Sequence, residues 1–542
     1  MTQKDFNGRL SIIFLFFLVL FFCVLIRLYL LQVLDQQFYL QLGTEQYGTE
    51  VIMQPARGLI YDRKKIAVVH NTEVNSAFVV PNQLQEADAL KSWLACSYPS
   101  VFERMMENQK SKFLWVDRSV SDESIDTLAG LGLADLLYLK EPQRYYPLAC
   151  MAPIIGFTNI DNVGIAGVEL LFQGRLGGKS ATFKLNRDAH SGGFYFTKEL
   201  VHKGIAGKPV VLTLDTQLQF LAHEELEKTV QEFGAKKGAV IILDPYTGEI
   251  LAMASVETPD SSTSEGMVDS IKNQPITDCY EFGSVMKAFT ALAALEEGLV
   301  TNDELIDCHG DTYVLQGLRV TNPFHAEVLP FIEVMKKSAN IGLAQIALRL
   351  GPKLYDHLAK LGFGKVTGIA FPGERAGYLG KPTQWCRFTP MVMSFGYEIS
   401  ATLLQLAHAF AIVSNGGFSI EPQLYLVPKP KRIKQPVRLY KPKAIAAIKE
   451  ILEHIGSKYP ISGYTVLGKT GTARCVKDGR YSTTDHIYTF GGLIESEKYH
   501  RVIVTSITCT NETNKARRWA SQVSAPLFHT IAQKMVLIER NH

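Results

Sequence analysis

The sequence has few cysteines for its length, and none of them lies in a metal-binding pattern. Eight cysteines are spread over 542 residues, without a Cys-x-x-Cys pair and without zinc-finger spacing to any of the thirteen histidines. Zinc sites bring such ligands together at short, regular spacings. The sequence therefore predicts no metal site and no cofactor, and it favours isolated buried thiols over a disulfide framework.

The chain also lacks an excess of charge of either sign. Lys and Arg total 56 against 53 Asp and Glu, which gives a net charge of +3. A protein that binds a phosphate backbone needs a concentrated positive surface. This near balance predicts that nucleic acid is not a partner.

Long apolar runs are missing too, with one exception near the N-terminus. The run Ile12–Ile26 continues through Arg27 to Leu31 and is long enough to cross a bilayer core of about 30 Å as a helix. An arginine near the end of a span can reach the headgroups. No small-residue cleavage site follows, so we expect an uncleaved anchor at 11–31 in place of a signal peptide.

Basic residues before this run predict its orientation. Lys4 and Arg9 lie in the segment 1–10, and positive residues favour the cytoplasmic side of a span. We expect a cytoplasmic tail at 1–10 and everything after about residue 32 outside the cytoplasm. The protein is predicted to cross the membrane once.

A glycine- and proline-bearing link at 202–209 divides the rest of the chain. Before it, residues 32–205 mix short strand-like runs with polar turns. After it, residues 206–542 read as an α/β or α+β domain. The expected elements there are a helix at 217–232, strands at 239–244, 488–494 and 502–508, a hairpin turn at 245–248 and a closing helix at 525–538.

Ser284-Val-Met-Lys287 is the only Ser-x-x-Lys in the chain. It opens a predicted helix that ends near Gly298, and residues three apart share a helix face, so the Lys287 amine can reach the Ser284 hydroxyl. A serine alcohol needs an adjacent base to become a nucleophile, and a buried lysine with a lowered pKa can be that base. The alternative is a serine that caps a helix with an exposed lysine one turn on.

Ser338-Ala-Asn340 opens a second predicted helix, which ends at Gly351. In a catalytic role these two short polar side chains would bridge Lys287 and hold a substrate amide. Serine and asparagine are also favoured helix caps, so a purely structural role stays open.

A strand-like run leads into the third motif, Lys469-Thr-Gly-Thr472. Gly471 would let an extended peptide approach the backbone closely. Lys469, Thr470 and Thr472 could hold a carboxylate. The alternative is a strand that runs into a turn.

The order Ser-x-x-Lys, Ser-x-Asn, Lys-Thr-Gly is the signature of serine transpeptidases and β-lactamases. The stretch Asp278–Lys287 resembles the Tyr-Glu-Pro-Gly-Ser-Thr-x-Lys motif of class B penicillin-binding proteins, and departs from it at Phe282 and Val285. Other stretches resemble that family's non-penicillin-binding module (57–63, 164–169) and its division-specific branch, the penicillin-binding protein 3 type (361–365, 373–377, 394–406).

The resemblance implies a fold and a reaction. The expected fold is α+β, with a single transmembrane helix, an elongated pedestal of the dimerisation type at 32–205, and a β-lactamase-like transpeptidase domain at 206–542 whose β-sheet is flanked by helices. Ser284 would attack the D-Ala-D-Ala amide of a peptidoglycan stem peptide, and an acceptor amine would take the acyl group. The backbone N–H groups of Ser284 and Thr472 would form the oxyanion hole.

The same resemblance implies a place and partners. We expect septal wall synthesis at the inner membrane with a periplasmic catalytic domain, covalent inhibition by β-lactams, and a SEDS-family glycan polymerase and other division proteins as partners. An anchored β-lactamase, a β-lactam sensor and a division scaffold with dispensable catalysis remain alternatives. Arg57, Asp62, Arg63, Glu169 and His486 are expected to be structural.

The predicted topology can be tested with reporter fusions. A reporter that is active only outside the cytoplasm, fused after residue 60, should be active because Lys4 and Arg9 hold the N-terminus inside. A cytoplasm-active reporter at the same position serves as the control and should be silent. The reverse pattern would rule out peptidoglycan as the substrate.

Overall fold

The computed structural model describes most of the chain. The described residues are 3–39, 48–84, 87–111, 113–133, 135–187, 194–258, 272–426, 435–477, 479–510 and 518–540. The chain forms two compact units, each built from separate segments. Unit 1 contains residues 1–57, 71–143 and 178–207, and unit 2 contains residues 58–70, 144–177 and 208–542.

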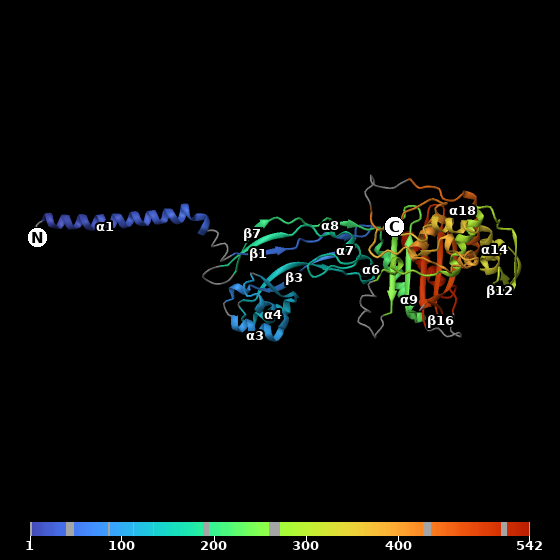
Figure 1. Ribbon diagram of the computed structural model, residues 1–542, viewed down its shortest axis with the longest axis horizontal. Helices are drawn as coiled ribbons and strands as arrows, with labels where there is room; N and C mark the ends of the chain where they lie inside the picture. The colour runs from blue at the N-terminus through green and yellow to red at the C-terminus, as the bar shows by residue number, and fades with distance from the viewer. Residues whose placement is uncertain are drawn as a thin grey trace. The chain divides into compact units, whose positions relative to one another are not determined.

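The N-terminal apolar run forms helix α1 (Gln3–Tyr29), which continues into a short π-helical turn at Leu30–Leu34 (Figure 1). The stretch Leu10–Leu34 has a mean hydropathy of 2.9, and none of it is buried within the protein. Among the described residues it is the one helix long and apolar enough to cross a membrane. Exposed phenylalanine and leucine side chains on every face are typical of a helix surrounded by lipid.

The folded part of unit 1 contains two groups of strands. One is an antiparallel sheet of β1 (Gly48–Met53), β6 (Ala181–Arg187) and β7 (Phe194–His202). In the other, the 75–79 part of β3 (Ala67–Val79) pairs with β4 (Leu114–Val120). Helices α3 (Ala87–Ser97), α4 (Pro99–Glu107) and α5 (Asp122–Ala129) and strand β5 (Leu137–Tyr145) complete it, and a small apolar core joins α3 and α4 to β3 and β4.

Unit 2 is built on a five-stranded antiparallel sheet. Its strands follow the order β10-β9-β17-β16-β15, which leaves β10 and β15 at the edges. The hairpin of β9 (Lys237–Leu243) and β10 (Ile250–Glu257) and the strands β16 (Arg480–Glu495) and β17 (His500–Cys509) confirm the strands expected from the sequence. The edge strand β15 (Thr465–Lys477) carries the third motif.

Helices cover both faces of this sheet. Alternate side chains of a strand point to opposite faces, and on β9 the side chains of Val240 and Ile242 join one core while Ile241 and Leu243 join the other. The first core contains α9 (Thr216–Phe233) and α19 (Ser524–Arg540). The second contains the remaining long helices, α12 (Lys287–Glu296), α14 (Asn340–Leu350), α17 (Leu403–Ser414) and α18 (Pro442–Gly456) (Figure 1). The prediction of a sheet flanked by helices is confirmed.

Shorter elements connect these layers. The first group comprises β2 (Ile60–Tyr61), α6 (Ala152–Ile155), α7 (Gly167–Leu171), α8 (Gln173–Leu176), β8 (Val210–Val211) and α11 (Gln274–Thr277). The second comprises a long hairpin of β11 (Leu305–Leu315) and β12 (Leu318–Pro330), followed by α13 (Phe331–Lys336), α15 (Lys353–Lys360), β13 (Tyr378–Leu379), α16 (Thr389–Ser394) and β14 (Ile399–Ser400).

Segments 58–70 and 144–177, which precede the link at 202–209, pack within unit 2 through polar contacts. Asp62 accepts a hydrogen bond from the Thr216 hydroxyl at 2.8 Å, and Arg63 pairs with Glu249 at 3.1 Å. Arg144 and Glu169 form an ion pair at 2.9 Å with side chains that are 1% and 0% exposed. Asp62, Arg63 and Glu169 therefore make the structural contacts that the sequence predicted.

Removing one member of the buried pair should destabilise unit 2. Glu169→Ala leaves the Arg144 guanidinium buried without its carboxylate, at an expected cost of about 3–5 kcal/mol in unfolding free energy, measured by chemical denaturation. Arg349→Gln, which removes an exposed pair with Glu304, is the control and should cost about 0–1 kcal/mol. Equal, small losses in both variants would contradict this account.

Candidate active site

Ser284 lies on a single 3-10 turn, Gly283–Val285, directly before α12. The sequence predicted that Ser284 opens the α-helix itself, whereas the α-helix begins at Lys287. The 3-10 turn leads through Met286 into α12, and such turns are common at the N-termini of α-helices. Gly283 has a left-handed φ of +58°, which favours glycine at that position. The turn presents the half-buried Ser284 to a cleft instead of aligning it with the helix surface.

Lys287 is completely buried and surrounded by oxygen atoms. Its Nζ atom lies 2.6 Å from the Ser338 carbonyl oxygen, 3.0 Å from Ser338 Oγ and 2.6 Å from Asn340 Oδ1. Burial and the nearby charge of Lys469 lower the pKa of Lys287 well below its usual value. The alternative of an exposed lysine behind a helix cap is wrong.

Asn340 reaches Lys287 from the first turn of α14, whereas Ser338 reaches it from an irregular turn before that helix. Helix α14 begins at Asn340 after Ala339, which offers no capping side chain, so the interpretation of Ser338 and Asn340 as ordinary caps is wrong. Ser338 has a left-handed φ of +57°, a conformation that is strained for a residue with a Cβ atom. This turns its hydroxyl toward the two buried lysines.

Lys469 is the second buried lysine, with 1% of its surface exposed. Its Nζ donates to Ser338 Oγ at 3.3 Å and to the Thr470 carbonyl at 3.1 Å. Burial, together with the charge of Lys458, lowers its pKa to about 7. Ser338 Oγ therefore lies between two lysine side chains from different elements.

The third motif stays in the sheet throughout. Strand β15 pairs with β16 continuously from Thr465 to Arg474, so the alternative of a strand that ends in a turn at this motif is wrong. A Cβ atom on Gly471 would lie 2.3 Å from the Phe282 carbonyl oxygen, which means that only glycine allows the strand to pack against the Ser284 turn.

The motifs meet in a cleft of about 820 Å³. Ser284, Ser338, Asn340, Thr470 and Thr472 line it. Its other lining residues include four basic side chains and no acidic one, and the basic residues are Lys336, Lys337, Lys458 and Arg474. A cleft with this charge favours an anionic ligand such as a peptide that ends in a carboxylate.

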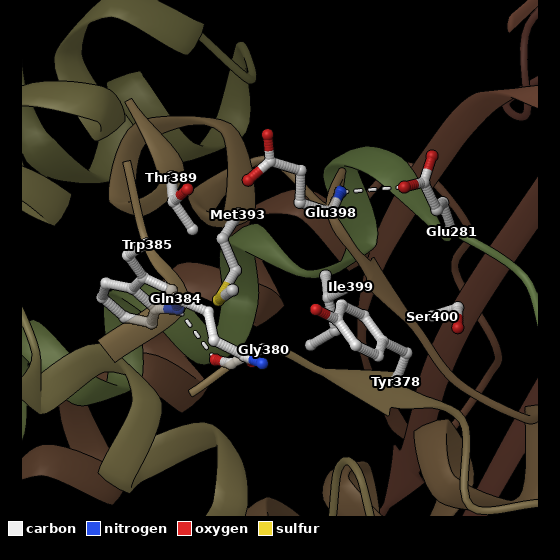
Figure 2. A pocket seen from close by; sticks show the side chains of 10 residues that line it. All are labelled: Glu281, Tyr378, Gly380, Gln384, Trp385, Thr389, Met393, Glu398, Ile399 and Ser400. Carbon is white, nitrogen blue, oxygen red and sulfur yellow. Dashed lines mark hydrogen bonds between the residues drawn. The ribbon is translucent and has the colours of Figure 1, made fainter. Parts of the chain in front are cut away.

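A smaller pocket of about 320 Å³ has the opposite charge (Figure 2). Its lining includes Glu281 and Glu398, and Glu281 accepts a hydrogen bond from the Glu398 backbone N–H at 2.8 Å. Burial raises the pKa of the Glu281 carboxyl. The two glutamates are 117 positions apart, so no local pattern in the sequence pointed to this pocket.

A serine that lies three residues before a buried lysine whose pKa is lowered, at the start of a helix, is typical of enzymes that form a serine acyl intermediate. The protein-family model described as "Penicillin binding protein transpeptidase domain" matches residues 238–533, which is more than half of the chain. A second family model, described as "Penicillin-binding Protein dimerisation domain", matches residues 52–212. The chain belongs to the penicillin-binding protein transpeptidases, as its motifs predicted.

Curated relatives cover nearly the whole chain. The chain is 29% identical over 545 residues to the "Probable peptidoglycan D,D-transpeptidase PenA" of Neisseria gonorrhoeae, covering 97% of this chain and 92% of that protein. It is 28% identical over 498 residues to the "Peptidoglycan D,D-transpeptidase FtsI" of Escherichia coli, covering 88% of this chain and 82% of that protein. These relatives agree with the predicted resemblance to the division-specific branch.

Solved structures share the fold. Penicillin-binding protein 3 of Mycobacterium tuberculosis superposes with a TM-score of 0.66 and 24% identity, covering 90% of this chain and 97% of that chain. A peptidoglycan synthetase of Bifidobacterium adolescentis superposes with a TM-score of 0.70 and 17% identity, covering 91% of this chain and 97% of that chain. The predicted fold class is confirmed.

The electrostatic coupling of Lys458 to Lys469 can be tested directly. Lys458→Gln removes a positive charge that disfavours the protonated Lys469 amine, so the pKa of Lys469 should rise from about 7. NMR of labelled lysine side chains would follow the titration. The matched control is Lys360→Gln, which removes a lysine that contacts the Tyr440 ring and should leave the titration of Lys469 unchanged. An unchanged pKa in Lys458→Gln would refute the coupling.

Proposed function

We propose that the chain is a peptidoglycan D,D-transpeptidase that works through an acyl-enzyme on Ser284. The observation that carries this proposal is the burial of Lys287 among three oxygen atoms, with a lowered pKa. A neutral amine has two hydrogens and one lone pair. The Ser338 carbonyl and Asn340 Oδ1 can only accept hydrogen bonds, so a neutral amine donates its two hydrogens to them. Its lone pair can then accept a proton from a hydroxyl, either that of Ser338, the third neighbour, or that of Ser284.

The first half of the reaction forms the ester. Lys287 takes the hydroxyl proton of Ser284, whose Oγ attacks the carbonyl carbon of the D-Ala-D-Ala amide. The backbone N–H groups of Ser284 and Thr472 stabilise the oxyanion. The carbon–nitrogen bond then breaks. The Ser338 hydroxyl passes its proton to the leaving D-Ala amine and takes the proton held by Lys287, which becomes neutral again.

The second half of the reaction transfers the acyl group. An acceptor amine on another stem peptide attacks the ester and gives up a proton to the neutral Lys287. The ester bond then breaks, and Lys287 returns that proton to the Ser284 oxygen. Before the ester forms, Lys469, Thr470, Gly471 and Thr472 hold the donor peptide, with the carboxylate of its terminal D-Ala at Lys469 and its backbone along β15. An edge strand supports this arrangement, because it offers unpaired backbone groups to an extended peptide.

We further propose the setting of this reaction. Residues 11–31 anchor the protein in the inner membrane, residues 1–10 stay in the cytoplasm, and the pedestal (32–205) and transpeptidase domain (206–542) lie in the periplasm. The role is septal wall synthesis, with a SEDS-family glycan polymerase and other division proteins as partners and with β-lactams as covalent inhibitors. The FtsI name of the E. coli relative supports the division role.

The β-lactamase alternative depends on the fate of the ester. Rapid hydrolysis needs a second base that activates water, which in class A β-lactamases is a glutamate. The Glu-x-x-Leu-Asn pattern that carries it does not occur between Asn340 and Lys469. This absence favours a long-lived penicilloyl ester.

Mass spectrometry of the intact protein after incubation with benzylpenicillin tests the proposal. We expect one adduct per chain on the peptide that contains Ser284, lasting for minutes or longer, and no adduct in Ser284→Ala. A working hydrolase would instead turn over about 1–1000 molecules per second. Such turnover would favour the β-lactamase, and undiminished labelling of Ser284→Ala would exclude this nucleophile.

A further inference from the structure

The N-terminus of α14, which carries Asn340, receives its cap from another part of the chain. The first turn of a helix leaves backbone N–H groups without helical partners, and Ala339 at the cap position has no side chain that could accept them. Ser338 turns toward the lysines instead. The Asn322 side chain on strand β12 accepts a hydrogen bond from the Ile341 N–H at 3.0 Å.

Asn322 is held in this position by an irregularity in its own hairpin. The pairing of β11 with β12 shifts register between Asp307 and Gly310 and again before Thr312. The Asn322 Nδ2 group donates to the Cys308 carbonyl at 3.1 Å and to the Gly310 carbonyl at 2.7 Å. Asn322 is 6% exposed. These partners fix the orientation of its amide, because carbonyls require Nδ2 and the Ile341 N–H requires Oδ1.

Thr321, the residue before Asn322, fixes the orientation of the Asn340 amide in the same way. The Thr321 carbonyl accepts a hydrogen bond from Asn340 Nδ2 at 2.7 Å. This contact leaves Asn340 Oδ1 to face Lys287 Nζ at 2.6 Å. In the flipped amide, Oδ1 would face the Thr321 carbonyl, and two acceptors would repel each other, so the Thr321 carbonyl fixes the orientation of the amide.

We propose that Asn322 is a positioning residue of the reaction. By capping α14 from the β11–β12 hairpin, it holds the Thr321 carbonyl against Asn340 and so aims Asn340 Oδ1 at Lys287. This inference rests on the proposed function, in which Lys287 is the base. It assigns the hairpin a role in assembling the catalytic site.

Full-length Asn322→Ala and wild-type protein would be compared for acylation by benzylpenicillin. The variant loses all three hydrogen bonds, and we expect its second-order acylation rate to fall at least about tenfold, toward the ~100-fold that a 1 Å misplacement costs. Asn302→Ala is the matched control, since Asn302 is also buried and bonds the Ala447 carbonyl and Glu450. It should lower the melting temperature without changing acylation.

A second variant separates positioning from stability. Asn322→Asp keeps an acceptor for Ile341 N–H and brings a negative charge toward Lys287, which favours the protonated amine and should move the acid limb of the acylation pH profile to higher pH. Asn302→Asp should not move it. This variant also tests the inference if Asn322→Ala does not fold.

The results distinguish this inference from the proposed function. Wild-type protein that is not labelled at Ser284 would refute the function itself. Labelled wild type, together with an Asn322→Ala variant that acylates at the wild-type rate or an Asn322→Asp variant with an unshifted pH profile, would refute only the positioning role of Asn322.

Discussion

The site depends on the burial of two lysine side chains next to one serine oxygen. Lys287 and Lys469 are almost inaccessible to solvent, and both lie within hydrogen-bond distance of Ser338 Oγ. Two ammonium ions this close, in a region from which water is excluded, repel each other and lose their hydration. Both pKa values are lowered, which favours the neutral form of the amines, the form that can take a proton. The arrangement costs stability, and in the proposed function it provides the base that Ser284 needs.

The surrounding fold keeps these groups together despite that cost. Helix α12 supplies Lys287, the edge strand β15 supplies Lys469, and a left-handed Ser338 reaches both. Gly471 lets the strand pack against the Ser284 turn. Lys287 and Lys469 lie on a helix and a strand, which position side chains more closely than loops do, whereas Ser338 lies in the turn between α13 and α14. The cleft beside them carries only positive charge, whereas the neighbouring pocket of Glu281 and Glu398 carries negative charge.

Local patterns predicted a large part of this structure. The apolar run, the β9–β10 hairpin, the two C-terminal strands and the positions of the three motifs follow from hydrophobic periodicity and from residue types within a few positions of each other. The sequence did not predict the left-handed Ser338, which is stabilised by contacts with two lysines 51 and 131 positions away. It also missed the Asn322 cap and the acidic pocket, because their partners meet only in the folded chain.

The central claim is that Lys287 is a neutral base at the pH at which the enzyme works. Its most direct test is an NMR titration of the Lys287 side-chain amine in full-length protein with labelled lysine, assigned by comparison with Lys287→Met. The account predicts a pKa well below the usual lysine value of about 10.4, so that a substantial neutral fraction exists near neutral pH. A Lys287 amine that remains fully protonated up to about pH 9, more than one unit below that reference value, would contradict it.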